Sequence, residues 1–210
     1  MMFLSCFLLL NLVVTHETAE PVNIGERRNQ HNPLDLLPRF SPEWIESPKY
    51  RVVKTYIDFE LREYDEAHSV SIPLDFSDEK NIIIHLLKYF DGSNSAGLRM
   101  NISTPIVMTV SLGASESTVM TTSMFLPAEV TNPPMPLQSG KYHLTLERRP
   151  KASYYVKSFS MNALDDSIHK NTFDFIKKLT IENGLNVWKS SVVMSLYSDR
   201  YEVWLLAVLN

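Results

Sequence analysis

Short runs of alternating apolar and polar residues make up most of the chain after residue 47, and such alternation is typical of β-strands. Two longer segments instead repeat their apolar residues at helical spacing. The pattern predicts strands at 50–55, 58–63, 68–73, 99–111, 118–126, 141–147, 153–159, 191–197 and 201–209, and helices at 78–91 and 165–183. This order predicts an α+β protein of two similar hairpin-helix-hairpin units, whose sheets join into one antiparallel barrel. Within the second unit, we expect 141–147 to pair with 153–159.

Both expected helices carry residues that favour helix ends. Ser77 is expected to cap the first helix, and Gly92 is expected to end it in the left-handed conformation. The second helix is expected to start near Asp165-Asp166 and to stop at Asn183-Gly184. Its regularly spaced residues predict one buried face, formed by Ile168, Thr172, Phe175, Ile176 and Leu179.

The first helix carries more apolar surface than packing on a sheet requires. Its apolar arc spans roughly 200°, whereas about 100° is enough for an amphipathic surface helix. The central stripe consists of Ile83, Leu86, Leu87 and Phe90, and Ile82, Tyr89 and Ile84 widen it. We therefore expect something beyond the sheet to cover the excess. The N-terminal arm, another subunit and a flat apolar ligand are the alternatives.

The first 46 residues differ from the rest of the chain. Residues 3–14 form an apolar run of signal-peptide length, too short to cross a membrane as a helix, so we expect residues 1–19 to be a signal peptide of a secreted protein. The alternative is a cytoplasmic protein in which this run is a buried N-terminal element. Residues 20–46 are polar and proline-rich and predict an N-terminal arm, followed by a domain at 47–210. Cys6, the only cysteine, would be lost with the signal peptide, and Asn101 begins a glycosylation sequon.

Composition excludes several functional classes. Hydrophobic residues make up 44% and charged residues 21% of the chain, values that are ordinary for a soluble globular protein. The net charge of −4 provides no electrostatic footprint for nucleic acid. Glycine-rich phosphate loops, G-x-S-x-G and zinc-ligand spacings are absent from the sequence, and the S-x-x-K match at residues 77–80 lacks its partner motifs. We expect a non-catalytic protein without a dedicated metal site.

Five short motifs occur in a characteristic order. They are Phe59-Glu60-Leu61-Arg62-Glu63-Tyr64, the helix end Asp91-Gly92-Ser93-Asn94, the strand Met100-Asn101-Ile102-Ser103-Thr104-Pro105-Ile106-Val107, the turn Asn132-Pro133-Pro134-Met135-Pro136, and Arg200-Tyr201-Glu202-Val203-Trp204. Together they resemble the SOUL/heme-binding protein family, whose members show Y-E-I-R-x-Y, Y-x-x-G-x-N, M-T-x-P-V, P-P-x-P and R-N-E-V/I-W. The resemblance covers about residues 47–210. It implies a distorted eight-stranded antiparallel barrel flanked by two helices.

The resemblance also implies a ligand and a place for it. Family members hold heme or a related tetrapyrrole in a shallow hydrophobic groove beside the first helix, for carriage or buffering. Carried over to this chain, Ile83, Leu87 and Lys88 line the groove, Lys80 lies one turn earlier, and Met194 approaches from the penultimate strand. A lysine at the rim would pair with a carboxylate of the macrocycle.

This sequence departs from the family pattern at two places. Some members carry a histidine ligand directly after Y-E-I-R, where this chain has Glu63, and Tyr197-Ser198-Asp199 replaces a longer insertion before the last motif. His85 is expected to point away from the apolar stripe, and His68 lies near the replaced position. No axial ligand is therefore assigned. A heme-independent protein-interaction module on the same fold is the alternative function.

Overall fold

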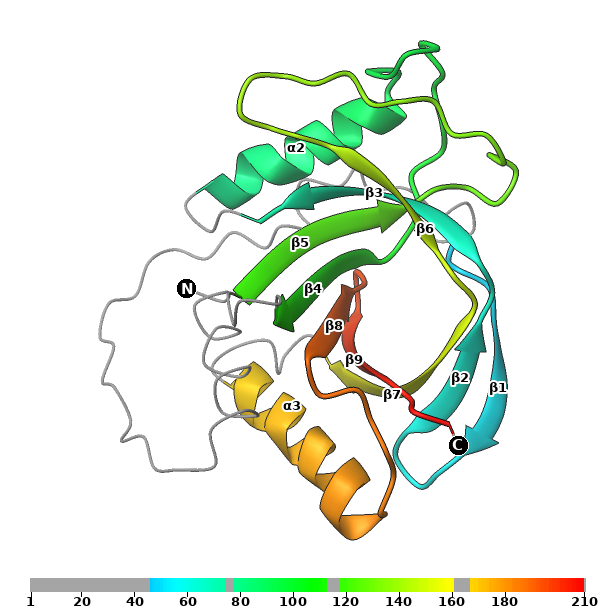
Figure 1. Ribbon diagram of the computed structural model, residues 1–210, viewed down its shortest axis with the longest axis vertical. Coiled ribbons are helices and arrows are strands. Elements are labelled where there is room, and N and C mark those ends of the chain that lie inside the picture. Colours follow the sequence, from blue (N-terminus) through cyan, green and yellow to red (C-terminus); the bar gives the residue numbers. More distant parts are fainter. Residues whose placement is uncertain (1–45, 75–77, 113–117, 161–166, 210) are drawn as a thin grey trace.

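A computed structural model describes residues 46–74, 78–112, 118–160 and 167–209. These residues form one curled, antiparallel sheet with two helices outside the curl (Figure 1). The first half of the chain forms β1 (Tyr50–Thr55), β2 (Glu60–Tyr64), β3 (Ala67–Pro73), α2 (Glu79–Phe90), β4 (Ile106–Leu112) and β5 (Thr118–Phe125). The second half forms β6 (Thr145–Arg149), β7 (Ala152–Ser160), α3 (Ser167–Lys177) with a π-helical turn at Lys178–Glu182, β8 (Ser191–Leu196) and β9 (Arg200–Leu206).

The α+β class with two flanking helices is confirmed. The sheet has nine strands, one more than the eight that the family resemblance implied. β1 lies at one edge of the sheet, pairs with β2 alone among the described strands, and has six exposed residues. Residues 1–45, which include the expected signal peptide, Cys6 and nearly all of the expected N-terminal arm, lie outside the described residues. Ser77, the expected helix cap, also lies outside them.

The strand order shows how the two halves interlock. The order is β1-β2-β7-β9-β8-β4-β5-β3-β6. The order from β2 to β6 is symmetric: it reads the same in reverse if β2 is exchanged with β6, β3 with β7, β4 with β8 and β5 with β9. This symmetry agrees with two similar units. Each unit contributes its first strand to the other unit, because β2 pairs with β7 and β6 pairs with β3.

The expected pairing of 141–147 with 153–159 is wrong. β6 pairs with β3 at the edge of the sheet, whereas β7 lies between β2 and β9. Pro150 stands between the two strands and has no backbone N–H to continue a ladder. The chain therefore crosses from one half of the sheet to the other instead of folding back. The strand expected at 99–111 is also shorter, since β4 begins only after Pro105.

Helix ends and faces follow the sequence closely. Gly92 follows α2 with a φ of 96°, the positive value expected at a helix end. Gly184, with a φ of 62°, follows the π-helical turn in the same way. The expected buried face of α3 is confirmed, since these five side chains are all buried: Ile168, Thr172, Phe175, Ile176 and Leu179.

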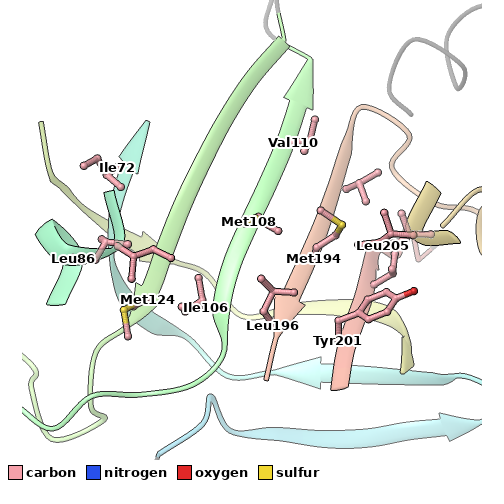
Figure 2. Close-up of a cluster of buried hydrophobic side chains, with 14 of the residues drawn as sticks. Ile72, Leu86, Ile106, Met108, Val110, Met124, Met194, Leu196, Tyr201 and Leu205 are labelled. Atoms are coloured by element: carbon pink, nitrogen blue, oxygen red, sulfur yellow. The ribbon is translucent and has the colours of Figure 1, made fainter. Parts of the chain in front are cut away.

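The two faces of the sheet differ in character. Neighbouring residues of a strand point to opposite faces. The convex face packs against the helices in a large apolar cluster, part of which is shown in Figure 2, including Leu86 of α2, Met108 of β4 and Met194 of β8. The concave face carries a smaller aromatic cluster around Tyr64 and Trp204, together with buried charged and hydroxyl side chains.

Candidate functional site

One side of the α2 apolar arc is covered by the chain itself. The segment between β5 and β6, residues 127–144 (the proline-rich segment), passes over α2 (Figure 1). The Tyr89 hydroxyl donates a hydrogen bond to the Pro134 carbonyl at 2.8 Å, and Leu144 joins the core. Tyr89 and Ile82 are buried as a result. The sequence does not indicate this contact, because the proline-rich segment has no strand or helix periodicity.

The opposite side of α2 remains partly open. Ile84 and Leu87 are half-buried, and Lys88, one position further along the helix, is exposed. Leu87 packs against the edge of the core cluster. These three residues form a narrow apolar edge with a cation beside it, which we call the α2 ledge.

The structure separates the residues expected to line a groove. Leu87 and Lys88 lie together on the α2 ledge. Ile83 lies beneath it in the core, with 2% of its surface exposed. Met194 is equally buried and packs on the convex face of β8 beside Leu196 (Figure 2). The side chain of Lys80 lies outside the described part of the structure.

His85 is held on the covered side of α2. Its ring stacks on Tyr142 with the ring centroids 3.9 Å apart, and its Nδ1 lies 2.8 Å from the Asn81 carbonyl oxygen. Asp78 accepts hydrogen bonds from the Tyr142 hydroxyl and from Lys141 Nζ. These hydrogen bonds, from Lys141 first and Tyr142 second, lower the pKa of Asp78 to about 2. The proline-rich segment is thereby fixed to the start of α2 by charge as well as by ring stacking.

The position at which some family members carry a ligand histidine is occupied by ion pairs. Glu63 Oε1 lies 2.7 Å from Arg51 Nε and 2.7 Å from Lys151 Nζ. The hydrogen bonds from Arg51 and Lys151 lower the pKa of Glu63 to about 2. His68 lines a separate cavity of about 380 Å³ together with Pro48 and Leu126.

A buried ion pair joins the two ends of the domain. Arg62 Nη1 lies 3.2 Å from both carboxylate oxygens of Glu202, which has only 1% of its surface exposed. Trp204 Nε1 donates to Glu202 at 2.9 Å. Burial opposes the charge of Arg62, but the hydrogen bond to Tyr64 and the charge of Glu202 outweigh it, so the pKa of Arg62 is raised.

Sequence reasoning missed this ion pair. In the sequence, Arg62 and Glu202 stand out only as members of two separate motifs, and the two residues are 140 positions apart. The available signal was alternation, because Arg62 follows the apolar-charged pattern of residues 59–62 and Glu202 stands between Tyr201 and Val203. A charge in the polar phase of a strand normally faces water. Here the sheet curls, and the part of its concave face around Glu202 is closed off from solvent.

Membrane-spanning helices and metal-binding clusters are both absent from the described residues. None of the helices in the described ranges has the length and apolar character needed to cross a membrane. Among the same residues, no group of three or more histidine, cysteine, aspartate or glutamate side chains is arranged to hold a metal ion.

The family is decided by sequence comparison. The family model of the SOUL heme-binding protein matches residues 45–206. The chain belongs to the SOUL family. The matched range contains all nine strands and both helices described above. No curated protein matches the chain.

The SOUL motifs can now be assigned to contacts. Asn94, in the turn after α2, donates through Nδ2 to the carbonyls of Tyr89 and Leu98, and its Oδ1 accepts from the backbone N–H of Leu98. The turn at 132–136 packs against the same helix end through Pro134. Arg62 and Glu202, from the first and last motifs, form the buried ion pair. In this chain the motifs therefore hold the fold together.

Several solved structures share part of the architecture. A putative bacterial transcription regulation protein from Staphylococcus aureus MU50 is 9% identical, with 72% of this chain and 99% of that chain covered and a TM-score of 0.41. SAV2435 bound to tetraphenylphosphonium is 12% identical, with 72% and 94% covered and a TM-score of 0.40. A hydrolase from Listeria innocua is 10% identical, with 74% and 94% covered and a TM-score of 0.49. With TM-scores below 0.5, these likenesses support no conclusion about function.

Proposed function

We propose that this SOUL protein binds heme or a related tetrapyrrole without catalysing a reaction, for carriage or buffering. The observation that carries the proposal is the match of a heme-binding family model to residues 45–206. When bound, the tetrapyrrole supplies a conjugated ring and its metal, and the chain supplies the surface that holds them.

The α2 ledge is the surface that fits such a ligand best. Ile84 and Leu87 offer apolar area for one side of a flat ring, and the exposed Lys88 ammonium stands where a ring carboxylate needs a partner. Ile83 and Met194 are buried, so in this proposal they support the ledge from beneath rather than contact the ring. No axial ligand is assigned.

Hemin titration tests the proposal. Hemin is added to the full chain while the Soret band is followed, and a saturable shift is expected. Leu87→Glu puts a carboxylate against the ring and is expected to weaken binding by about tenfold or more. Lys88→Glu is expected to weaken binding as well, because it removes the cation and adds a repelling charge.

Lys170→Glu provides the matched control, since Lys170 is an exposed lysine on α3, far along the chain from the ledge. It is expected to bind hemin like the wild type. Absorbance that rises linearly with hemin without saturation, or equal binding by Leu87→Glu and wild type, would contradict the proposal.

A second candidate function is a heme-independent protein-interaction module. It is favoured by the burial of Ile82 and Tyr89, since much of the α2 apolar arc is already occupied by the chain's own residues. This candidate requires that hemin leaves the spectrum unchanged. It also requires that Leu87→Glu, and not Lys170→Glu, reduces capture of a protein partner.

Secretion is part of the proposal. Asn101 of the sequon is exposed and lies outside the strands, where an oligosaccharide has room. N-terminal sequencing of protein exported by expressing cells tests this directly. A mature chain that begins near residue 20 is expected, and intact protein retained in the cytoplasm would contradict it.

A further inference from the structure

A second cavity lies on the concave face of the sheet, away from both helices. Its volume is about 410 Å³, within the range of about 300–1,000 Å³ that is typical of small-molecule sites. Its walls come from β4, β5, β8 and from the crossing between β6 and β7, where Arg149 and Pro150 stand. We call it the concave cavity. It shares no lining residue with the α2 ledge.

Arg149 is a positioned cation in the wall of this cavity. Its Nε donates to Ser69 Oγ at 3.0 Å, and its Nη2 donates to Ser123 Oγ at 2.7 Å. Its guanidinium carbon lies 5.3 Å from the centre of the Phe125 ring. Neutral hydroxyls and an aromatic ring fix the orientation of the guanidinium without neutralising its charge. Burial lowers the pKa of Arg149, which means that the charged form lacks full compensation.

The nearest carboxylate leaves room for another anion. Glu147 Oε2 lies 3.6 Å from Arg149 Nη2, which is too far for a hydrogen bond. Two arginines and this single glutamate line the cavity, but Arg148 is paired with Glu66, so Arg149 is the cation of the lining that lacks a close carboxylate partner.

The opposite wall offers hydroxyl groups. Thr109 and Thr121, paired across β4 and β5, line the cavity together with Ser111 and Ser191. Thr109 Oγ1 is buried and has no hydrogen-bond partner among the described residues. Leaving a buried hydroxyl unpaired is unfavourable, so a bound polar group that reaches it would offset an existing penalty. Ser71 and Ser195, which share the concave face, are similarly unpaired within the described ranges, and each has at most 1% of its surface exposed.

Apolar surface completes the cavity. Tyr154, Val193 and Leu206 contribute a ring and two aliphatic side chains to its lining. A ligand with a charged head and a flat apolar body would use both kinds of wall.

From this juxtaposition we propose that the concave cavity binds a small organic carboxylate, with Arg149 pairing to the carboxylate and Tyr154 packing against the body of the ligand. Arg149 Nε and Nη2 donate to Ser69 and Ser123, so the carboxylate would pair with the remaining N–H groups, on Nη1 and the second position of Nη2. The site is independent of tetrapyrrole binding at the α2 ledge.

Benzoate is a suitable probe, and benzamide is its neutral counterpart of equal size. Each compound is titrated into the ¹⁵N-labelled full chain while backbone amide signals are followed. Saturable shifts at Thr109, Thr121 and Arg149 are expected for benzoate. Benzamide is expected to bind at least about tenfold more weakly than benzoate. Equal binding of the two compounds, or benzoate shifts that do not saturate, would overturn the proposal.

Two variants with matched controls locate the site. Arg149→Gln is expected to weaken benzoate binding roughly tenfold or more, whereas Arg99→Gln, at an exposed arginine that pairs with Asp91 outside the cavity, leaves it within about twofold. Thr109→Val is expected to fold as well as the wild type, because its hydroxyl has no protein partner to lose, and to weaken binding a few-fold. This second variant decides the matter if Arg149→Gln does not fold. Unchanged benzoate affinity in folded Thr109→Val would refute the site.

Discussion

Glu202 is a buried carboxylate, so the surrounding side chains must replace the water that would otherwise hydrate its charge. Its carboxylate is sealed on the concave face and is approached by Arg62, Trp204 and Ser158. Burying a carboxylate is costly unless hydrogen bonds and an opposite charge replace water. The contacts of Glu202 supply both, so the stability of the domain depends on keeping this set complete.

Glu202→Gln is expected to destabilise the protein by about 3–5 kcal/mol, because it removes the buried carboxylate from the Arg62 guanidinium and leaves the more exposed Glu60 as its remaining carboxylate partner. The measurement is the free energy of unfolding from urea denaturation. Glu182→Gln, at an exposed carboxylate at the end of the π-helical turn, is the control and is expected to change that free energy little. A loss below about 1 kcal/mol for Glu202→Gln would show that the pair is dispensable.

Residue-level prediction from sequence succeeded where a side chain acts within its own element. The buried face from Ile168 to Leu179 depends only on helical spacing, and it is buried as expected. The sequence did not reveal the partners of Arg62 or Arg149, because those depend on which distant strands become neighbours in a curled sheet.

Among the elements, α2 and the proline-rich segment act as one unit. The segment covers Tyr89, stacks Tyr142 on His85 and ties Lys141 to Asp78. Helical periodicity predicted how wide the apolar arc of α2 is. It gave no indication of what lies on the arc, because a segment with four prolines follows no period. Whether the α2 ledge holds a tetrapyrrole remains a prediction for the same reason.

Acid is expected to loosen this unit. The pKa of Asp78 is about 2 in the folded protein, below its usual value of 3.8, so the folded state favours the ionised form. The stabilisation it provides is therefore complete above pH 4 or so and is lost as the pH falls towards 2. Asp78→Asn is expected to be less stable than the wild type in urea at pH 6, and this difference is expected to shrink at pH 2.5.

Asp174→Asn is the control for the acid experiment, because Asp174 is an exposed aspartate on α3. Its stability is expected to follow that of the wild type at both pH values. If Asp78→Asn and wild type differ equally at pH 6 and pH 2.5, ionisation of Asp78 is not what holds the proline-rich segment.

At the scale of the whole molecule, the exchange of β2 and β6 makes the two halves interdependent. Each half places one strand in the sheet of the other. The repeated element order predicted two units, but element order alone carries no information about this exchange. The exchange follows from the pairing of the strands on either side of Pro150, because β6 pairs with β3 and β7 pairs with β2.

The domain is accordingly expected to unfold in a single cooperative step. Urea unfolding followed by tryptophan fluorescence and by far-ultraviolet circular dichroism is expected to give coincident curves. Trp204 on β9 reports on the concave face, while circular dichroism reports on both halves. Two separate transitions would mean that the units are stable apart.

The interlocked topology also constrains how such a chain could arise. A peptide of half this length, with one copy of the unit, would leave a gap where the borrowed strand belongs. It would be complete only as a symmetric pair of molecules that lend each other their leading strands. Gene fusion would then have joined the two subunits of an obligate dimer into one chain, and the former interface, where β4 meets β8, now runs through the middle of the sheet. The concave cavity straddles that line, so the ancestral pair would have had its pocket on its axis of symmetry.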